Sequence, residues 1–91
     1  MLEISLVPGL VVCSKAGRDS GRYFIVLEIL SPEYVLIADG QKHRLAHPKK
    51  KKVKHLKLTE DVLESIGRKL TEKRQVFDSE VRSALRTYNE S

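Results

Sequence analysis

Residues 8–26 read PGLVVCSKAGRDSGRYFIV, and this stretch decides how the first half of the chain folds. Gly9–Ser14 and Arg22–Leu30 are rich in β-branched and aromatic residues, which favour extended backbone. Lys15–Gly21 lies between them, and its two glycines bracket the turn formers Arg18-Asp19-Ser20. The pattern predicts two β-strands joined by a glycine-rich loop.

The second of these strands is apolar on both faces at its start. Successive strand residues point to opposite faces. One face then carries four apolar side chains, and the other carries two before Glu28 interrupts it. The two sets are Tyr23, Ile25, Leu27 and Ile29, then Phe24 and Val26. This arrangement indicates a strand that bends around a small closed barrel and changes which face is buried.

Further strands are predicted downstream. Tyr34–Ala38 is a third strand, and Asp39-Gly40 is the strongest hairpin signal in the chain. Gln41–His47 returns as a fourth strand that ends at Pro48, and Val53–Lys57 alternates as a short fifth. Several short strands joined by tight turns predict a small, mostly β barrel, which also removes exposed sheet edges.

The remaining residues predict two short α-helices. Thr59 is the expected N-cap of the first helix, with Gly67 weakening its interior, and Asp78 is the expected N-cap of the second. Each helix carries an apolar stripe. The stripes are Val62, Leu63, Ile66 and Leu70, then Val81, Ala84, Leu85 and Tyr88. The predicted organisation is a barrel over residues 1–57 and a C-terminal helical appendage over residues 58–91.

Charge is distributed unevenly between these two parts. The 91 residues carry a net charge of +5. Residues 1–57 hold eleven basic and five acidic side chains, whereas residues 58–91 hold six basic and seven acidic ones. A chain of this length supports one modest core and excludes a two-lobed enzyme. The N-terminal part is therefore where a polyanion is expected to bind.

Signatures of catalysis and of metal binding are absent from the sequence. Residues 17–22 are glycine-rich but lack the spacing of a phosphate-binding P-loop and precede a strand. The single cysteine, Cys13, indicates a reducing, cytoplasmic setting and is expected to be a small buried strand residue. His43, His47 and His55 are too widely spaced for one metal ion on a straight strand. We expect no catalytic residue, metal or cofactor.

The strongest constellation is basic. Arginine and lysine side chains and glycine-shaped backbone turns are the groups that contact nucleic-acid phosphates. The alternative reading of the lysine run at residues 49–52 is a solvated loop that keeps the protein soluble. The aromatic side chains lie mostly in apolar strands, which favours recognition of structured RNA through its backbone, with Tyr34 as the exception most able to stack on a base.

The same residues resemble a known family. Pro8-Gly9-x-Val11-Val12-x-Ser14-Lys15-x-Gly17-Arg18-Asp19-x-Gly21-Arg22-x-Phe24-x-Val26 resembles a KOW motif. The continuation is similar to bacterial KOW-domain RNA-binding proteins, which are themselves similar to a large-subunit ribosomal protein of archaea and eukaryotes. The stretches that carry this likeness are residues 35–40, 43–45, 48–51 and 54–56.

The resemblance implies an SH3-like barrel and an RNA-binding, ribosome-associated role in translation. The expected RNA-binding residues, from the basic constellation and the resemblance together, are Lys15, Gly17, Arg18, Asp19, Arg22, Lys42, Arg44, Lys49, Lys50, Lys51, Lys52, Lys54 and His55. Ribosomal RNA is the expected partner, with protein contacts through the C-terminal helices and no membrane. The alternative is a protein-interaction module of the transcription or translation machinery, in which the helical apolar stripes would be partly exposed.

Overall fold

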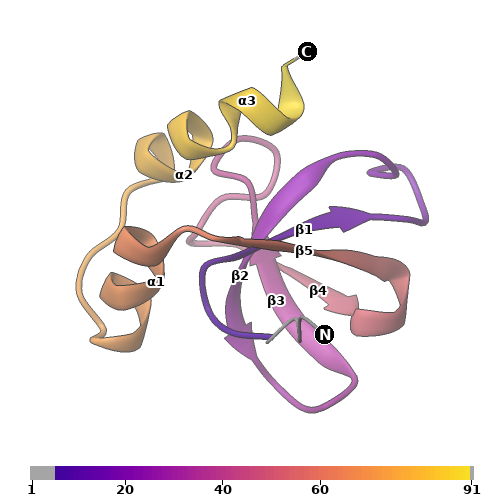
Figure 1. The fold of residues 1–91 in the computed structure, drawn as a ribbon, viewed down its shortest axis with the longest axis horizontal. Helices are drawn as coiled ribbons and strands as arrows, with labels where there is room; N and C mark the ends of the chain where they lie inside the picture. Colours follow the sequence, from indigo (N-terminus) through magenta and orange to yellow (C-terminus); the bar gives the residue numbers. More distant parts are fainter. Residues whose placement is uncertain (1–5, 91) are drawn as a thin grey trace.

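Five β-strands form the framework of the protein in the computed structural model, which describes residues 6–90 (Figure 1). The strands are β1 (Leu10–Ser14), β2 (Tyr23–Ile29), β3 (Tyr34–Ala38), β4 (Lys49–Lys52) and β5 (Leu56–Val62). A short 3-10 helix, η1 (Val53–His55), joins β4 to β5. The first three predicted strands are confirmed, with bounds within one residue of those expected.

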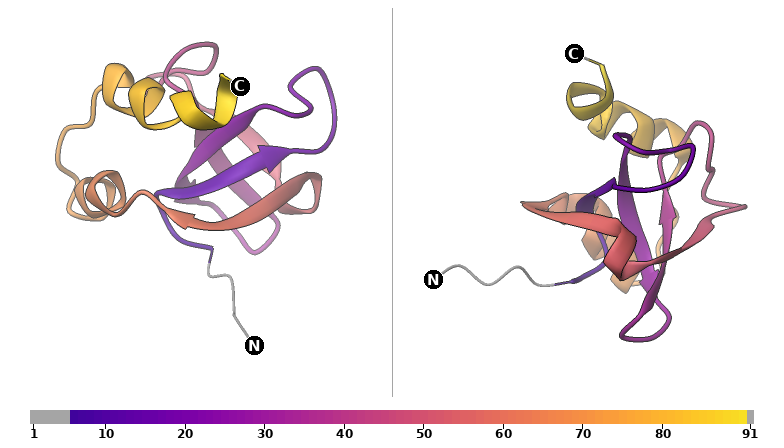
Figure 2. Two further views of the ribbon diagram at one scale, coloured as in Figure 1. Left: turned by 45° about the horizontal axis from the view of Figure 1, so that its top comes forward. Right: turned by 90° about the vertical axis from the view of Figure 1, so that its right-hand side faces the viewer.

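The strands form one antiparallel sheet in the order β4-β3-β2-β1-β5. The sheet is strongly curled, as the two views of Figure 2 show. Its pairing register shifts between Val26 and Glu28 in β2, and again between Leu10 and Val12 in β1. Such irregularities increase the bend and twist of a strand, and they let the sheet wrap around its own side chains.

The inner side of the curl is an aliphatic and aromatic core. Phe24, Val12 and Ile37 are fully buried there. Leu56 of β5 closes one side, and Val53 of η1 packs against the same cluster. This core unites residues from β1, β2, β3 and β5.

A second core lies on the outer face of β1 and β2. Val11 and Ile25 are both fully buried, although they point away from the inner core. Three short helices cover them: α1 (Glu64–Thr71), α2 (Asp78–Ala84) and α3 (Arg86–Asn89). The two apolar faces of β2 therefore have a simple cause, because the sheet core covers one face and the helices cover the other.

The predicted fourth strand at Gln41–His47 is wrong. These residues form a loop, because the Asp39 carboxylate accepts hydrogen bonds from the backbone N–H groups of Gln41 and His43, both at 2.9 Å. A side chain that satisfies nearby backbone groups competes with strand pairing. Pro48 follows the loop, and the strand itself is the lysine run, Lys49–Lys52.

The fifth strand begins three residues later than predicted and runs into the expected helix. Thr59 is not an N-cap, because it lies within β5 and its Oγ1 donates to the Val11 carbonyl at 2.7 Å. Pairing with β1 holds the chain extended to Val62. The expected boundary between the barrel (residues 1–57) and the helical appendage (residues 58–91) falls inside this strand. Residues 1–5 of the first range and residue 91 of the second lie outside the described part of the chain.

The C-terminal helices pack on the sheet. Asn89 binds the start of β2 twice, since its Oδ1 accepts from Tyr23 N at 2.8 Å and its Nδ2 donates to Tyr23 O at 3.1 Å. Val81 of α2 and Leu85, between α2 and α3, are buried against the sheet. Phe77, not Asp78, is the N-cap of α2, and the Asp78 carboxylate accepts from Leu45 N at 2.8 Å. Within residues 6–90, none of the helices is long and apolar enough to cross a membrane.

A close backbone contact explains the glycine inside α1. A Cβ atom added at Gly67 would lie 2.6 Å from the Pro8 carbonyl oxygen. A Cβ at Gly9 would in turn lie 2.8 Å from the Gly67 Cα. Gly67 weakens the helix by propensity, as the sequence indicates, but it allows α1 to approach the Pro8-Gly9 turn.

We therefore predict that Gly67→Ala destabilises the protein. Alanine favours an isolated helix by about 1 kcal/mol, but the forced backbone shift costs about 1–3 kcal/mol. The net free energy of unfolding, measured by urea denaturation, should fall. Ser65→Ala, at an exposed position of the same helix, is the control and should change it by less than about 0.5 kcal/mol. A Gly67→Ala protein more stable than this control would contradict the close-contact explanation.

Candidate nucleic-acid interface

The first loop, residues 15–22, is a compact turn built on its glycines. Gly17 and Gly21 have φ angles of 81° and 90°, a region that residues with a side chain rarely adopt. Backbone hydrogen bonds close the loop, with Ser20 N donating to Gly17 O at 3.2 Å and Gly21 N to Ser14 O at 2.8 Å. The side chains of Lys15 and Arg18 are exposed on it.

Asp19 does not face solvent as expected of an RNA-contacting residue. It is 8% exposed, and its Oδ2 accepts from Lys49 Nζ at 2.6 Å and lies 3.1 Å from His43 Nε2. The hydrogen bond from Lys49 is the main cause that holds the pKa of the Asp19 carboxyl below its ordinary value of 3.8, against the opposing effect of partial burial. Asp19 thus joins the first loop, the 39–47 loop and β4.

The four lysines of β4 divide between the two sides of the strand. Lys49 reaches Asp19, and Lys51 Nζ donates to the Ala16 carbonyl at 3.0 Å. Both stems lie along the first loop, so these two lysines hold that loop against the sheet. Lys50 and Lys52 point to the other side, where their Nζ atoms lie 4.6 and 5.9 Å from the Tyr34 ring centroid. The lysine run is therefore a paired edge strand and not a solvated loop.

Positive charge converges on His55. The backbone of Lys15 binds the backbone of His55, with N donating to O at 2.8 Å. Partial desolvation, and then the ammonium groups of Lys54, Lys51, Lys52 and Lys15, lower the pKa of the His55 imidazole below 6.5. These lysines come from the first loop, β4 and η1, which lie side by side. We call this surface the lysine face, consisting of Lys15, Lys51, Lys52, Lys54 and His55, with Lys50 on β4 and Arg18 on the first loop as exposed neighbours.

Arg22 lies apart from the lysine face, beside a second buried carboxylate. Its Nε donates to Oδ2 of Asp39, which is 1% exposed, and its Nη2 donates to Gln41 Oε1 at 2.9 Å. Burial opposes ionisation of Asp39, but hydrogen bonds from the His43 N–H, the Arg22 side chain and the Gln41 N–H outweigh it and lower the pKa of the carboxyl. Arg22 is thus partly committed to holding the 39–47 loop.

The structure does not bring all of the expected residues to one surface. Lys42 and Arg44 are exposed on the 39–47 loop and not on a strand. Lys42 lines a shallow pocket with Arg18 and Arg22, whereas Arg44 lines neither this pocket nor the neighbouring one that also contains Arg22. The expected site thus becomes a lysine face with a neighbouring arginine-rich pocket.

Cys13 and the three histidines lie in different surroundings. Cys13 is half-buried on β1, less enclosed than the sequence predicts. His43 contacts Asp19, His55 lies among the lysines, and His47 is exposed. Across residues 6–90, the structure contains no group of three or more side chains arranged to hold a metal ion.

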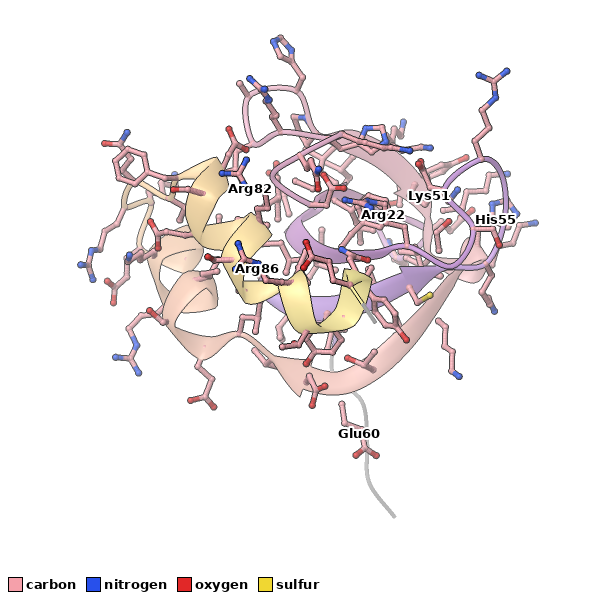
Figure 3. The ribbon with its side chains drawn as sticks, turned by 90° about the horizontal axis from the view of Figure 1, so that it is seen from above. Arg22, Lys51, His55, Glu60, Arg82 and Arg86 are labelled. Carbon is pink, nitrogen blue, oxygen red and sulfur yellow. The ribbon has the colours of Figure 1, made fainter. Side chains whose placement is uncertain are left out.

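Sequence reasoning missed the contribution of the C-terminal helices to this side of the molecule. Arg82, Arg86 and Asn89 line a pocket together with Arg22 (Figure 3). The available signal was the spacing of Arg82 and Arg86 by four residues, because both then lie on one helical face. Both arginines are far in sequence from the basic N-terminal part, so the sequence alone does not show that they lie beside Arg22.

No protein-family model matches the chain, and no curated protein matches it.

We predict that Asp19 contributes to stability in a pH-dependent way. Its pKa is lower in the folded than in the unfolded chain, so its stabilisation is present above pH 3.8 and is lost as pH falls through the lower folded-state value. Asp19→Asn should lower the free energy of unfolding at pH 6 and make the loss of stability below pH 4 shallower. Denaturant titrations from about pH 6 to pH 2 measure both effects.

Lys49→Gln removes the main cause of this pKa shift and should also flatten the acid-dependent loss. An unchanged pH dependence in both variants would show that the Asp19–Lys49 contact does not stabilise the fold.

Proposed function

We propose that this chain is a non-enzymatic RNA-binding protein of the KOW type on a small SH3-like barrel, associated with ribosomal RNA or the ribosome. The curled five-stranded antiparallel sheet is compatible with such a barrel. The observation that carries the proposal is the meeting of three lysine-bearing segments at His55, where Lys15 N donates to His55 O at 2.8 Å and Lys51 Nζ donates to Ala16 O at 3.0 Å. The nearest acid on these segments, Asp19, is largely buried and already bound to Lys49.

The geometry favours contact with the phosphate backbone over reading of unpaired bases. The exposed ammonium groups are compact point charges, which suit phosphate oxygens. Tyr34 is the aromatic side chain nearest to them, but it is half-buried and Lys50 lies over its ring. A base could stack there only after displacing that lysine, so we expect Tyr34 to support lysine placement instead.

The alternative, a protein-interaction module, receives less support. It expects partly exposed apolar stripes on the helices, including Leu63, Leu70, Leu85 and Tyr88. Leu85 is 1% exposed, whereas the other three are partly buried against the β1–β2 face. The packing of these stripes on the sheet reduces the apolar surface that a partner could contact.

We predict that Lys50→Gln/Lys52→Gln/Lys54→Gln weakens RNA binding and its salt dependence. These side chains have no ion-pair partner within residues 6–90. Loss of three phosphate contacts should reduce the slope of log K against log[salt] by about 2 in magnitude. Fluorescence anisotropy with a labelled ribosomal RNA fragment, between about 50 and 200 mM salt, measures the slope.

Arg68→Gln/Lys73→Gln/Arg74→Gln removes the same charge from exposed residues of α1 and the following linker. It is the matched control and should change the slope little. Equal weakening by the two triple variants would show that only net charge matters, and it would overturn the lysine face as the binding surface.

We also predict that RNA binding takes up a proton at His55. Partial desolvation and the neighbouring lysines lower the pKa of the His55 imidazole in the free protein, and a bound phosphate would raise it again. Affinity should therefore increase as pH falls from about 7.5 to 5.5. His55→Gln should remove most of this increase, whereas His47→Gln should retain it. An affinity independent of pH in the unmodified protein would exclude a phosphate beside His55.

A further inference from the structure

The C-terminal helices present two arginines on the side opposite to their core residues. Val81 and Leu85 are buried against the sheet, whereas Arg82 and Arg86 are exposed. The last two are four residues apart, on either side of the turn between α2 and α3, and both line the same pocket. In Figure 3, Arg82 and Arg86 lie along these helices on one side of Arg22, and Lys51 and His55 lie on its other side.

A groove connects these arginines to the first loop. One pocket, about 190 Å³ in volume, is lined by Arg22, Gln41, Arg82 and Arg86. A second, about 360 Å³, is lined by residues 18–22 of the first loop and by Lys42. Both pockets share Arg22 and Asn89. We call the two together the arginine groove, consisting of Arg18, Arg22, Lys42, Arg82, Arg86 and Asn89.

The acidic side chains in the groove do not cancel its positive charge. Asp39 is buried and its two oxygens are occupied by Arg22 and by backbone N–H groups. Glu90 lies 4.0 Å from Arg86, with both side chains largely exposed at 74% and 65%. An exposed pair of this kind is weak and yields readily to a stronger anion. Arg82 has no ion-pair partner within residues 6–90.

The groove is held in shape by the fold. Asn89 binds both backbone groups of Tyr23. The Tyr88 hydroxyl donates to Asp61 on β5 at 2.6 Å, and burial of Leu85 fixes the turn between α2 and α3. The helix backbone that carries the two arginines is therefore anchored before any ligand arrives. An anchored site loses less entropy when it binds.

We infer that α2 and α3 form the second half of the RNA-binding surface, with a phosphodiester of the RNA seated in the arginine groove. This inference rests on the proposed function. Guanidinium groups bind phosphate oxygens through two parallel hydrogen bonds, which an ammonium cannot do. Arg18 lines the groove and lies on the same loop as Lys15 of the lysine face, so one RNA backbone can cross the first loop from His55 to α3. The arginines thereby fix the direction of the RNA, and the lysines add attraction.

The test compares Arg82→Gln/Arg86→Gln with Arg68→Gln/Arg74→Gln, which removes the same charge from exposed residues outside the groove. The probe is the same labelled ribosomal RNA fragment, titrated with each full-length variant across the same range of salt concentrations. The groove variant should bind about 5- to 20-fold more weakly at 0.1 M salt, with a slope smaller by about 1.5 in magnitude. The control variant should bind like the unmodified protein. Circular dichroism and thermal unfolding verify that each variant is folded.

Glu90→Gln gives an independent test, because the Glu90 side chain is exposed and does not contribute to the core. Removing this carboxylate frees Arg86 and should tighten binding by about two- to threefold. A groove variant equal to its control, or a Glu90→Gln protein that binds no more tightly, overturns the inference. If the Lys50/Lys52/Lys54 variant still loses binding in that case, the proposed function stands. If the unmodified protein binds no RNA, both fail together.

Discussion

The basic surface depends on the contacts that the buried Asp19 carboxylate makes. Lysines from β4 and the first loop repel one another, and an arrangement that gathers them needs a compensating acid. Asp19 provides it by binding Lys49 and His43 from two different segments. Because its charge is used internally, it orders the loop without presenting a negative group to a polyanion. Asp39 plays the same part for Arg22 and the 39–47 loop.

The two-sided burial of β2 connects the core to the proposed function. The inner face completes the curled sheet, and the outer face, through Ile25, receives the helices. Once α2 and α3 are seated there, their exposed side necessarily lies beside the first loop, where Asn89 binds Tyr23. The helical segment, close to neutral as a whole, then places two of its arginines next to the basic N-terminal part. The net charge of each segment does not reveal this placement, because electrostatic interactions depend on the distance between charges in space and not on their separation in sequence.

The expectations that held depend on local physical chemistry. β1, β2 and β3 follow from β-favouring runs, and the first loop follows from glycines whose positive φ angles the turn requires. Two of the wrong expectations arose because a side chain forms hydrogen bonds with backbone groups that the residue pattern does not reveal. Asp39 turned an expected hairpin strand into a loop, and Thr59 bonded to β1 instead of capping a helix. Lysine has low strand propensity, yet Lys49–Lys52 became a strand because β3 offered an unpaired edge.

The amino-acid sequence by itself determined where the strands near the N-terminus lie, how the glycine loop turns and which half of the chain is basic. These features arise from residues close together in the chain, so composition and spacing reveal them. The tertiary structure alone decided that Asp19 is internal, that two of the four lysines hold the first loop and that Gly67 serves a close backbone approach. It also decided that Arg82 and Arg86 stand beside Arg22. Each of these depends on contacts between residues far apart in the chain, which only the packed sheet and helices bring within bonding distance.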